Sequence, residues 1–180
     1  VFGRRYQQVD SYRTDDAETV IVMIGSFSTK ARDAVDQLRK AGHKVGLVRP
    51  VLLRPFPETA LRQALAGKKG VAVIDQNLAA GRGGGLYTEI TSSLFGMPNA
   101  PAAVCSFIGG LGGRDIGPDE FYRMVRETAT AAQEGQTPPP RLLFTETELR
   151  EMRKLQAVAH AENTQTPDTP EEKNGEASAP

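Results

Sequence analysis

Two glycine-rich stretches are the parts of this sequence whose residue types could hold a ligand. Residues 81–85 read Gly-Arg-Gly-Gly-Gly, and residues 109–115 read Gly-Gly-Leu-Gly-Gly-Arg-Asp. Glycine backbone that leads into a helix exposes N–H groups to a phosphate or carboxylate, and an arginine adds charge-assisted hydrogen bonds. The candidate anion-binding or interface residues, including one arginine from a third loop, are Arg54, Gly81, Arg82, Gly83, Gly84, Gly85, Gly110, Gly112, Gly113, Arg114 and Asp115.

Packing is the alternative explanation of the same glycines, and it is the one we favour. Glycine permits positive φ angles and close approach of a neighbouring domain. Arg114 and Asp115 would then pin their loop through a salt bridge at an interface. Arg54 would pair with a carboxylate of a ligand or of another domain. Asp75, at the end of a predicted strand, is expected to cap the loop that follows it.

The sequence predicts no catalytic residue and no metal ligand. The turn at residues 25–30 has neither G-x-G-x-x-G nor G-x-x-x-x-G-K-[ST], which disfavours NAD, FAD and nucleoside triphosphate binding. Cys105 is the only cysteine, so the chain alone can form no intrachain disulfide and no cysteine-ligated zinc or iron–sulfur site, and we expect a buried, inert thiol. His43 and His160 are expected to be exposed, and no Ser–His–Asp or Cys–His arrangement is supported.

Alternating strand and helix patterns place the glycine-rich stretches at one edge of a sheet. Apolar, β-rich runs predict strands, each followed by a helix with apolar residues at helical spacing. Such repeats imply an α/β, three-layer Rossmann-like domain with a mainly parallel sheet and right-handed crossovers. Ligands or partners meet such a sheet at the carboxyl ends of its strands. The predicted strands are 19–25, 45–48, 71–74 and 102–108.

The change of composition along the chain predicts four segments. Residues 1–18 are expected to be a linker from a missing N-terminal domain, and residues 19–135 to be the α/β domain. Residues 136–161 contain a Pro-Pro-Pro spacer and then a helix opened by a Thr-x-x-Glu capping box. Residues 162–180 have almost no large apolar side chain and an acidic balance, so we expect a disordered tail.

The bulk composition excludes several classes of partner. The 180 residues carry 22 basic and 22 acidic side chains, which gives no long-range attraction to nucleic acid or to an anionic membrane. No apolar run approaches the roughly 20 residues that span a bilayer, and no signal peptide is visible. We therefore expect a cytoplasmic protein with neither a nucleic acid nor a membrane as its partner.

Six stretches of the sequence together resemble one family, the alpha subunits of pyruvate:ferredoxin oxidoreductases. The most specific are Arg-Pro-Phe-Pro at 54–57 and Gly-Leu-Gly-Gly-Arg-Asp-Ile at 110–116. The resemblance covers Gly3 to Glu134 and implies the domain similar to the transketolase C-terminal domain. The sequence departs from the family after the third strand, where Asp-Gln stands at 75–76 in place of the common Asp-Arg. The remaining stretches are 15–26, 34–39, 44–47 and 71–75.

The resemblance implies membership of a complex that converts pyruvate, coenzyme A and oxidised ferredoxin to acetyl-CoA, CO2 and reduced ferredoxin. In this family, thiamine diphosphate lies between an alpha N-terminal domain and the beta subunit, and the iron–sulfur clusters belong to other domains or subunits. This chain alone is therefore expected to bind no cofactor and to be inactive. Its role would be structural, at interfaces with other domains and with the beta, gamma and delta subunits. Ferredoxin would be a partner of the complex as a whole, and coenzyme A is expected to bind near this domain.

Two alternatives remain open at the level of sequence. One is a subunit of a branched-chain 2-oxoacid or 2-oxoglutarate:ferredoxin oxidoreductase, because the substrate would be selected outside this chain. The other is a stand-alone module that binds a small anion through the two glycine-rich loops.

Overall fold

The protein is described by a computed structural model, which covers residue 3 and residues 6–165. Within that range a single sheet is formed by the strands β1 (Val9–Tyr12), β2 (Thr19–Met23), β3 (Val45–Pro50), β4 (Gly70–Asp75), β5 (Ala103–Ile108) and β6 (Arg141–Leu142). Their order in the sheet is β1-β3-β2-β4-β5-β6. β1 runs antiparallel to β3, and all the other neighbours are parallel. The predicted α/β fold with a mainly parallel sheet is confirmed.

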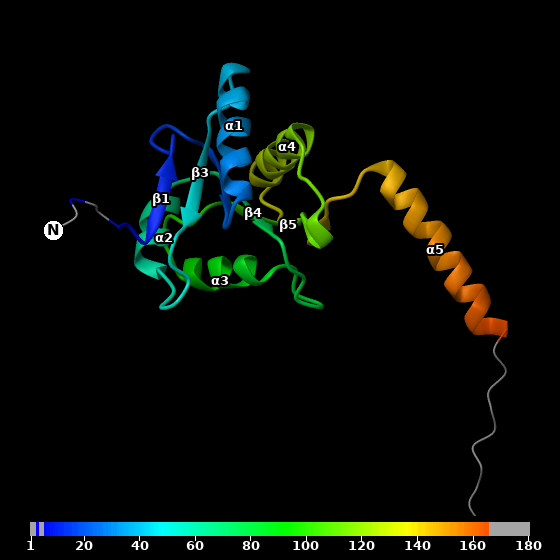
Figure 1. Cartoon of the computed structure of the whole chain (residues 1–180). Helices are drawn as coiled ribbons and strands as arrows, with labels where there is room; N and C mark the ends of the chain where they lie inside the picture. Colours follow the sequence, from blue (N-terminus) through cyan, green and yellow to red (C-terminus); the bar gives the residue numbers. More distant parts are fainter. Residues whose placement is uncertain (1–2, 4–5, 166–180) are drawn as a thin grey trace, which may run out of the picture. The chain divides into compact units, whose positions relative to one another are not determined.

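Helices cover both faces of this sheet. α1 (Phe27–Lys40) and α4 (Pro118–Glu134) lie on one face, and α3 (Gly85–Leu94) lies on the other (Figure 1). α2 (Glu58–Leu65) packs beside α3, and a short 3-10 turn, η1 (Leu111–Gly113), follows β5. No helix among the residues that the structure describes is long and apolar enough to cross a membrane.

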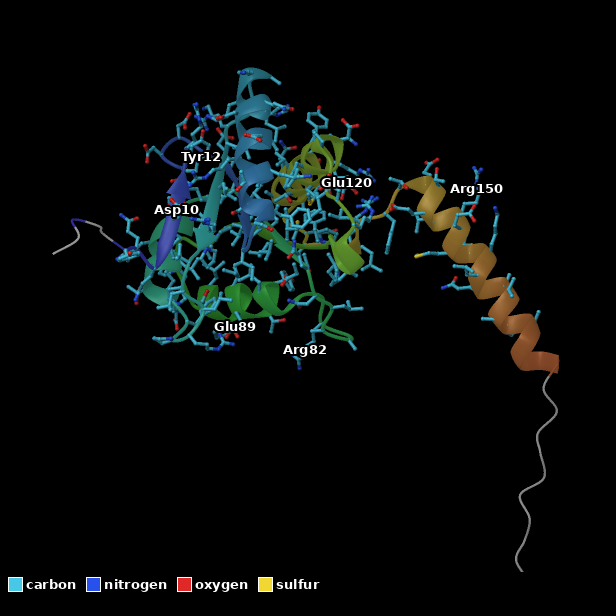
Figure 2. The ribbon with its side chains drawn as sticks, viewed as in Figure 1. Asp10, Tyr12, Arg82, Glu89, Glu120 and Arg150 are labelled. Carbon is cyan, nitrogen blue, oxygen red and sulfur yellow. The ribbon has the colours of Figure 1, made fainter. Side chains whose placement is uncertain are left out.

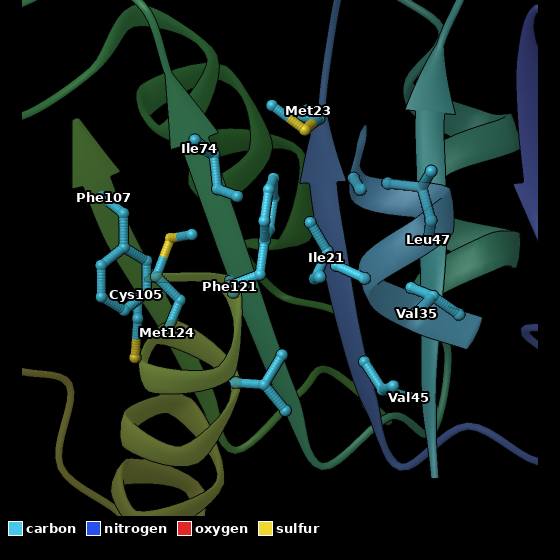
Figure 3. Close-up of a cluster of buried hydrophobic side chains, with 14 of the residues drawn as sticks. Ile21, Met23, Val35, Val45, Leu47, Ile74, Cys105, Phe107, Phe121 and Met124 are labelled. Carbon is cyan, nitrogen blue, oxygen red and sulfur yellow. The ribbon is translucent and has the colours of Figure 1, made fainter. Parts of the chain in front are cut away.

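Large apolar side chains fill the space between the sheet and the α1/α4 layer. Figure 3 shows Phe121 and Met124 of α4 facing the strands, with Ile21 on β2 and Phe107 on β5. All four side chains are at most 2% exposed. The strands β2, β3, β4 and β5 contribute residues to both layers in alternation, which is why they read as mainly apolar runs.

The parallel strands follow the order of a doubly wound sheet whose direction of winding reverses between β2 and β4. Across the sheet they lie in the order β3, β2, β4, β5 and β6, so the first of them along the chain, β2, lies between the second and the third. Ligand sites of such sheets lie where the order reverses, outside the carboxyl ends of the strands. The loops that meet there follow β2 and β4, with the loop after β5 next to them.

The segment expected to be a linker, residues 1–18, contains the edge strand β1. Asp10 pairs with Arg32 of α1 at 2.6 Å and with Arg49 of β3 at 3.2 Å. The Tyr12 hydroxyl donates to Asp36 of α1 at 2.9 Å; Figure 2 shows Asp10 and Tyr12 on this strand. Val-Asp-Ser-Tyr is too short and too polar to give a periodic strand pattern, so the strand depends on these tertiary contacts.

The expected spacer that follows residue 135 also contributes to the domain. Phe107 and Ile108 of β5 pair in parallel with Arg141 and Leu142 of β6, and Leu143 is only 3% exposed. The α/β unit therefore extends to Leu143, beyond the expected boundary at residue 135. A two-residue strand has no periodicity, which is why the sequence pattern did not reveal it.

The second unit begins at Phe144 and contains α5 (Glu146–Gln165). Its predicted capping box is confirmed: the Glu148 N–H donates to the Thr145 hydroxyl at 3.2 Å, and the Thr145 N–H donates to the Glu148 carboxylate at 2.6 Å. The helix extends four residues into the segment expected to be a disordered tail. The rest of that predicted tail, residues 166–180, lies outside the described residues.

Candidate functional site

The end of β4 is bonded directly to the start of α3. Asp75 is 2% exposed, and its two carboxylate oxygens accept from the N–H groups of Leu86 at 2.8 Å and Tyr87 at 3.0 Å. The Asn77 side chain accepts from the Gly85 N–H at 2.9 Å. The expected capping role of Asp75 is confirmed, and a carboxylate at this end of a helix also suits the helix dipole.

These bonds decide what the first glycine-rich loop can offer to an anion. The N–H of Thr88 donates to the carbonyl oxygen of Gly84 at 3.2 Å, so the N–H groups of residues 85–88 all have partners inside the chain. A helix start binds anions through N–H groups that lack such partners. The Asp75 carboxylate thus occupies the position that a phosphate would take.

Two of the loop glycines are required by close contacts. A Cβ added to Gly84 would lie 1.9 Å from the Asp75 carboxylate oxygen. A Cβ added to Gly83 would lie 2.8 Å from the Ser106 hydroxyl and 3.0 Å from Pro140, and the φ angle of Gly83 is +84°. These distances support the packing explanation for Gly83 and Gly84, with the contacts made inside the domain.

The tip of the same loop is the part that faces solvent. The Ala79 N–H donates to the Gly83 carbonyl at 2.6 Å and the Arg82 N–H donates to the Ala79 carbonyl at 2.9 Å, which closes a tight turn. Gly81, with a φ angle of +75°, has no neighbour near the position of a Cβ. Arg82 is exposed, and Figure 2 shows it at the lower border of the domain. Arg82 is therefore the one candidate of this loop whose side chain is available to a ligand or partner.

The second glycine-rich loop is held by an ion pair between a partly buried arginine and a buried glutamate, which differs from the expected Arg114–Asp115 bridge. Arg114 Nη1 lies 3.0 Å from Glu120 Oε1, and the two side chains are 17% and 8% exposed. Arg114 also donates to the backbone carbonyl of Asp115 at 3.1 Å. The Asp115 carboxylate pairs instead with Lys30 of α1, whose hydrogen bond lowers the pKa of Asp115. Arg114 thus pins this loop to the first turn of α4.

Gln76 occupies the point where the strand order reverses. A Cβ on Gly25, in the turn after β2, would lie 4.0 Å from Gln76 Oε1, and a Cβ on Gly110, after β5, would lie 3.2 Å from Gln76 Nε2. Gln76 is exposed and uncharged. The motif analysis did not include it among the candidates, although its position directly after a central strand was a usable signal. Its amide replaces the arginine that the family resemblance leads one to expect.

Arg54 has its carboxylate partner within the same chain. Its guanidinium lies 2.5 Å from Glu89 of α3, and Arg54 Nη1 donates to the carbonyl of Leu53 at 2.7 Å. The side chain is 71% exposed, so the pair lies at the surface. This contact ties the loop after β3 to the middle of α3.

Outside these loops, the described residues form neither a nucleophile–base pair nor a metal site. Cys105 is fully buried, and burial raises the pKa of its thiol, which favours the protonated, unreactive form. His43 is exposed, and its ring meets that of Tyr122 edge-on at 5.6 Å between centroids. In the described part of the chain, no three His, Cys, Asp or Glu side chains gather in a way that could hold a metal ion.

Asp75→Asn should change how stability depends on pH. Burial raises the pKa of Asp75 above its ordinary value of 3.8, against the lowering effect of its two backbone hydrogen bonds. A folded-state pKa above the unfolded one stabilises the fold below 3.8, and this contribution is lost as pH rises through the folded pKa. As the pH rises through the acid range, the free energy of unfolding in urea should therefore fall more in the native chain than in Asp75→Asn. If the stability of the native chain instead rose with pH relative to that of Asp75→Asn, the raised pKa of Asp75 would be contradicted.

Sequence comparison places most of the described domain in one family. The model of the pyruvate:ferredoxin oxidoreductase core domain II matches residues 17–121. The chain is 41% identical over 128 residues to the pyruvate synthase subunit PorA of Methanothermobacter thermautotrophicus, covering 71% of this chain and 32% of that subunit. It is 39% identical over 121 residues to the alpha subunit of the NADH-dependent phenylglyoxylate dehydrogenase of Aromatoleum evansii, covering 67% and 29%. The chain thus spans about a third of the length of these curated relatives.

Two solved structures share the fold. The inactive beta4 tetramer of a split-gene transketolase aligns with a TM-score of 0.56 at 16% identity, covering 71% of this chain and 44% of that chain. The 2-oxoglutarate:ferredoxin oxidoreductase of Magnetococcus marinus, with 2-oxoglutarate, coenzyme A and succinyl-CoA bound, aligns with a TM-score of 0.54 at 24% identity, covering 69% and 20%. At these identities the likeness concerns the fold alone.

Proposed function

Because this chain belongs to the pyruvate:ferredoxin oxidoreductase core domain II family, we propose that it is part of the alpha subunit of a pyruvate:ferredoxin oxidoreductase. In that complex pyruvate, coenzyme A and oxidised ferredoxin would give acetyl-CoA, CO2 and reduced ferredoxin. The observation that carries the proposal is the family match over residues 17–121 of a domain whose loops are bonded internally. Its role would be to hold other domains in place, without chemistry of its own.

The residues of this chain do not fit the cofactors of the complex. One buried cysteine cannot ligate an iron–sulfur cluster, which needs several thiolates. The start of α3, the helix that follows the glycine-rich loop after β4, has its N–H groups bonded to Asp75 and Asn77, so they are not free to hold a diphosphate. We therefore assign thiamine diphosphate and the clusters to other domains and to the beta, gamma and delta subunits. On this proposal the chain alone is inactive and works in the cytoplasm.

The substrate is proposed from the names that the relatives carry. Relatives with 41% and 39% identity are named for pyruvate and for phenylglyoxylate, so likeness in this domain does not separate 2-oxoacids. Pyruvate is proposed because the family model and the relative with 41% identity carry that name. Coenzyme A is bound in the solved 2-oxoglutarate enzyme, and the exposed loop tip that carries Arg82 is where we propose that it would approach this domain.

The test is recovery of the tagged chain from its source cells grown without oxygen. We expect partners with thiamine-binding and iron–sulfur regions, and pyruvate- and coenzyme A-dependent reduction of a viologen dye by the eluate. In calorimetry, the isolated chain should show no binding of thiamine diphosphate. Activity with 2-oxoglutarate or a branched-chain 2-oxoacid alone would move the assignment to that enzyme. Micromolar binding of inorganic phosphate by a partnerless chain, lost in Arg82→Ala, would favour a stand-alone anion-binding module.

A further inference from the structure

The outer edge of β1 is open. β1 is the last strand on its side of the sheet, and no other strand among the described residues pairs with its outer edge (Figure 1). The Val51 N–H donates to the Gln8 carbonyl at 2.9 Å, which directs the backbone groups of residue 8 toward β3. In an antiparallel pair, successive residues direct these groups to opposite sides, so the even-numbered residues of β1 also bond to β3. The N–H and C=O groups of Val9 and Ser11 therefore point away from the sheet.

The polar side chains of β1 that could protect this edge are bonded to its own domain. Charged side chains, prolines and bulges are what usually keep an edge strand from pairing with another chain. The one charged residue of the strand, Asp10, is held between Arg32 of α1 at 2.6 Å and Arg49 of β3 at 3.2 Å. The Tyr12 hydroxyl also bonds to α1, whereas Ser11, on the opposite face, is exposed and uncharged. β1 therefore contributes no charged side chain to the α2 face of its edge.

A groove runs beside this edge, and the described residues that line it are all uncharged. It has a volume of about 460 Å³ and lies between β1, with the two glutamines before it, and Ala60, Gln63 and Ala64 of α2. The two alanines are one helical turn apart, so their small side chains leave space above the edge. An added strand could thus place alternate side chains against α2 while its backbone bonds to Val9 and Ser11, which is the geometry of β-strand addition.

We infer that β1 is a self-association site, at which the β1 strand of a second copy of this chain pairs antiparallel to it. A two-fold axis at Asp10 would place Val9 opposite Ser11 of the second copy, and Ser11 opposite Val9 of the second copy. Each of these two residue pairs exchanges two N–H···O bonds, so four hydrogen bonds would use the outward groups of both strands. The inference goes beyond the proposed function and does not depend on it.

The length of the open edge favours a second copy over a longer extended segment. The Gln8 carbonyl is bonded to β3, and Arg13, with a φ angle of +50°, ends the strand on the other side. Only two residues therefore offer outward groups, so a longer strand would gain nothing from its further residues. A second β1 has the same two N–H and two C=O groups at the same spacing. The opposed Asp10 side chains are compatible with this pairing, because each carboxylate already lies between two guanidinium groups.

Ser11→Pro tests the pairing, with Ser11→Ala as the matched control. Proline removes the outward N–H of residue 11, and an edge strand tolerates this because that N–H has no partner within the sheet. In sedimentation velocity, the native chain and Ser11→Ala should dimerise with the same dissociation constant, about 10–100 µM for so short a strand pair. Ser11→Pro removes two of the four bonds and should raise this constant at least about tenfold. As the concentration of the native chain rises, hydrogen exchange should slow at Val9 and Ser11 but not at β6, the other edge strand.

Ser11→Asp decides the case in which Ser11→Pro does not fold. It keeps the backbone N–H but places one carboxylate from each copy beside the two-fold axis, so it should weaken dimerisation, and added salt should restore part of it. A native chain that stays monomeric up to about 1 mM overturns the inference, as does a dimer that Ser11→Asp leaves intact. Equal weakening by Ser11→Ala and Ser11→Pro, or slowed exchange on another surface, overturns it as well. These results leave the proposed function as it stands, because that is tested by the partners recovered from cells.

Discussion

Replacing Gly84 by alanine is expected to lower the free energy of unfolding by about 3 kcal/mol, because the new methyl group must displace the Asp75 carboxylate. The Cβ would lie 1.9 Å from Asp75 Oδ2, a distance that no small adjustment relieves. Moving the carboxylate breaks its bonds to the N–H groups of Leu86 and Tyr87, which leaves buried donors without partners. Urea denaturation with a circular dichroism readout measures the loss.

Gly117→Ala is the matched control for this substitution. Gly117 precedes α4 as Gly84 precedes α3, and their backbone angles are close: φ −84° and ψ 164° against φ −92° and ψ 158°. Nothing lies closer than 4.0 Å to the Cβ position of Gly117. Any intrinsic preference for glycine before a helix affects both variants alike and amounts to about 0.5 kcal/mol. Equal losses in the two variants would show that the contact with Asp75 is not what requires Gly84.

Arg114→Ala should lower the free energy of unfolding by about 3 kcal/mol, because it leaves the Glu120 carboxylate buried without its ion-pair partner. Glu120 would keep one hydrogen bond, from the Gly117 N–H at 2.9 Å. The exposed Arg82 supplies the control, and Arg82→Ala should change stability by no more than about 0.5 kcal/mol. Both variants can be compared in one series of urea denaturation curves.

The double variant Arg114→Ala, Glu120→Gln distinguishes the ion pair from the loss of packing. If the buried charge is the cause, removing it should restore part of the stability lost in Arg114→Ala, and the two substitutions should be strongly non-additive. Additive effects would mean that the guanidinium matters only through the space it fills. The same series bears on ligand binding, since an arginine needed for stability is a poor candidate for a free anion contact.

The strands and helices of the α/β unit could be predicted because each is long enough to show its period. β2, β4 and β5 are buried on both faces and read as unbroken apolar runs. β1 and β6 could not be predicted, because their four and two residues are specified by partners distant in the sequence. For β1 these partners are side chains of α1 such as Arg32 and Asp36.

For the candidate residues too, local patterns were predictable and contacts between residues distant in the sequence were not. Glycine patterns located the loops after β4 and β5, and the capping role of Asp75 was predictable from its place at the end of a strand. The ion-pair partners were not predictable. Glu89 for Arg54 and Lys30 for Asp115 are brought together only by the packing of helices on the sheet, and Glu120 for Arg114 depends on how the chain turns into α4. The significance of Gln76 depends on strand order, which a local pattern does not contain.

The bond from Asp75 to the first turn of α3 has a consequence for how this chain can vary. The bond joins the first and last residues of the loop after β4, so the position of α3 does not depend on the path of the loop residues between Asp75 and Leu86. The turn at 80–82 contributes no hydrogen bond to α3 and can change in length, since doubling a flexible loop costs only about 0.6 kcal/mol of closure entropy. Insertions and deletions among relatives should therefore gather at this tip. It is also where a fluorescent label or an epitope can be inserted while the fold is kept.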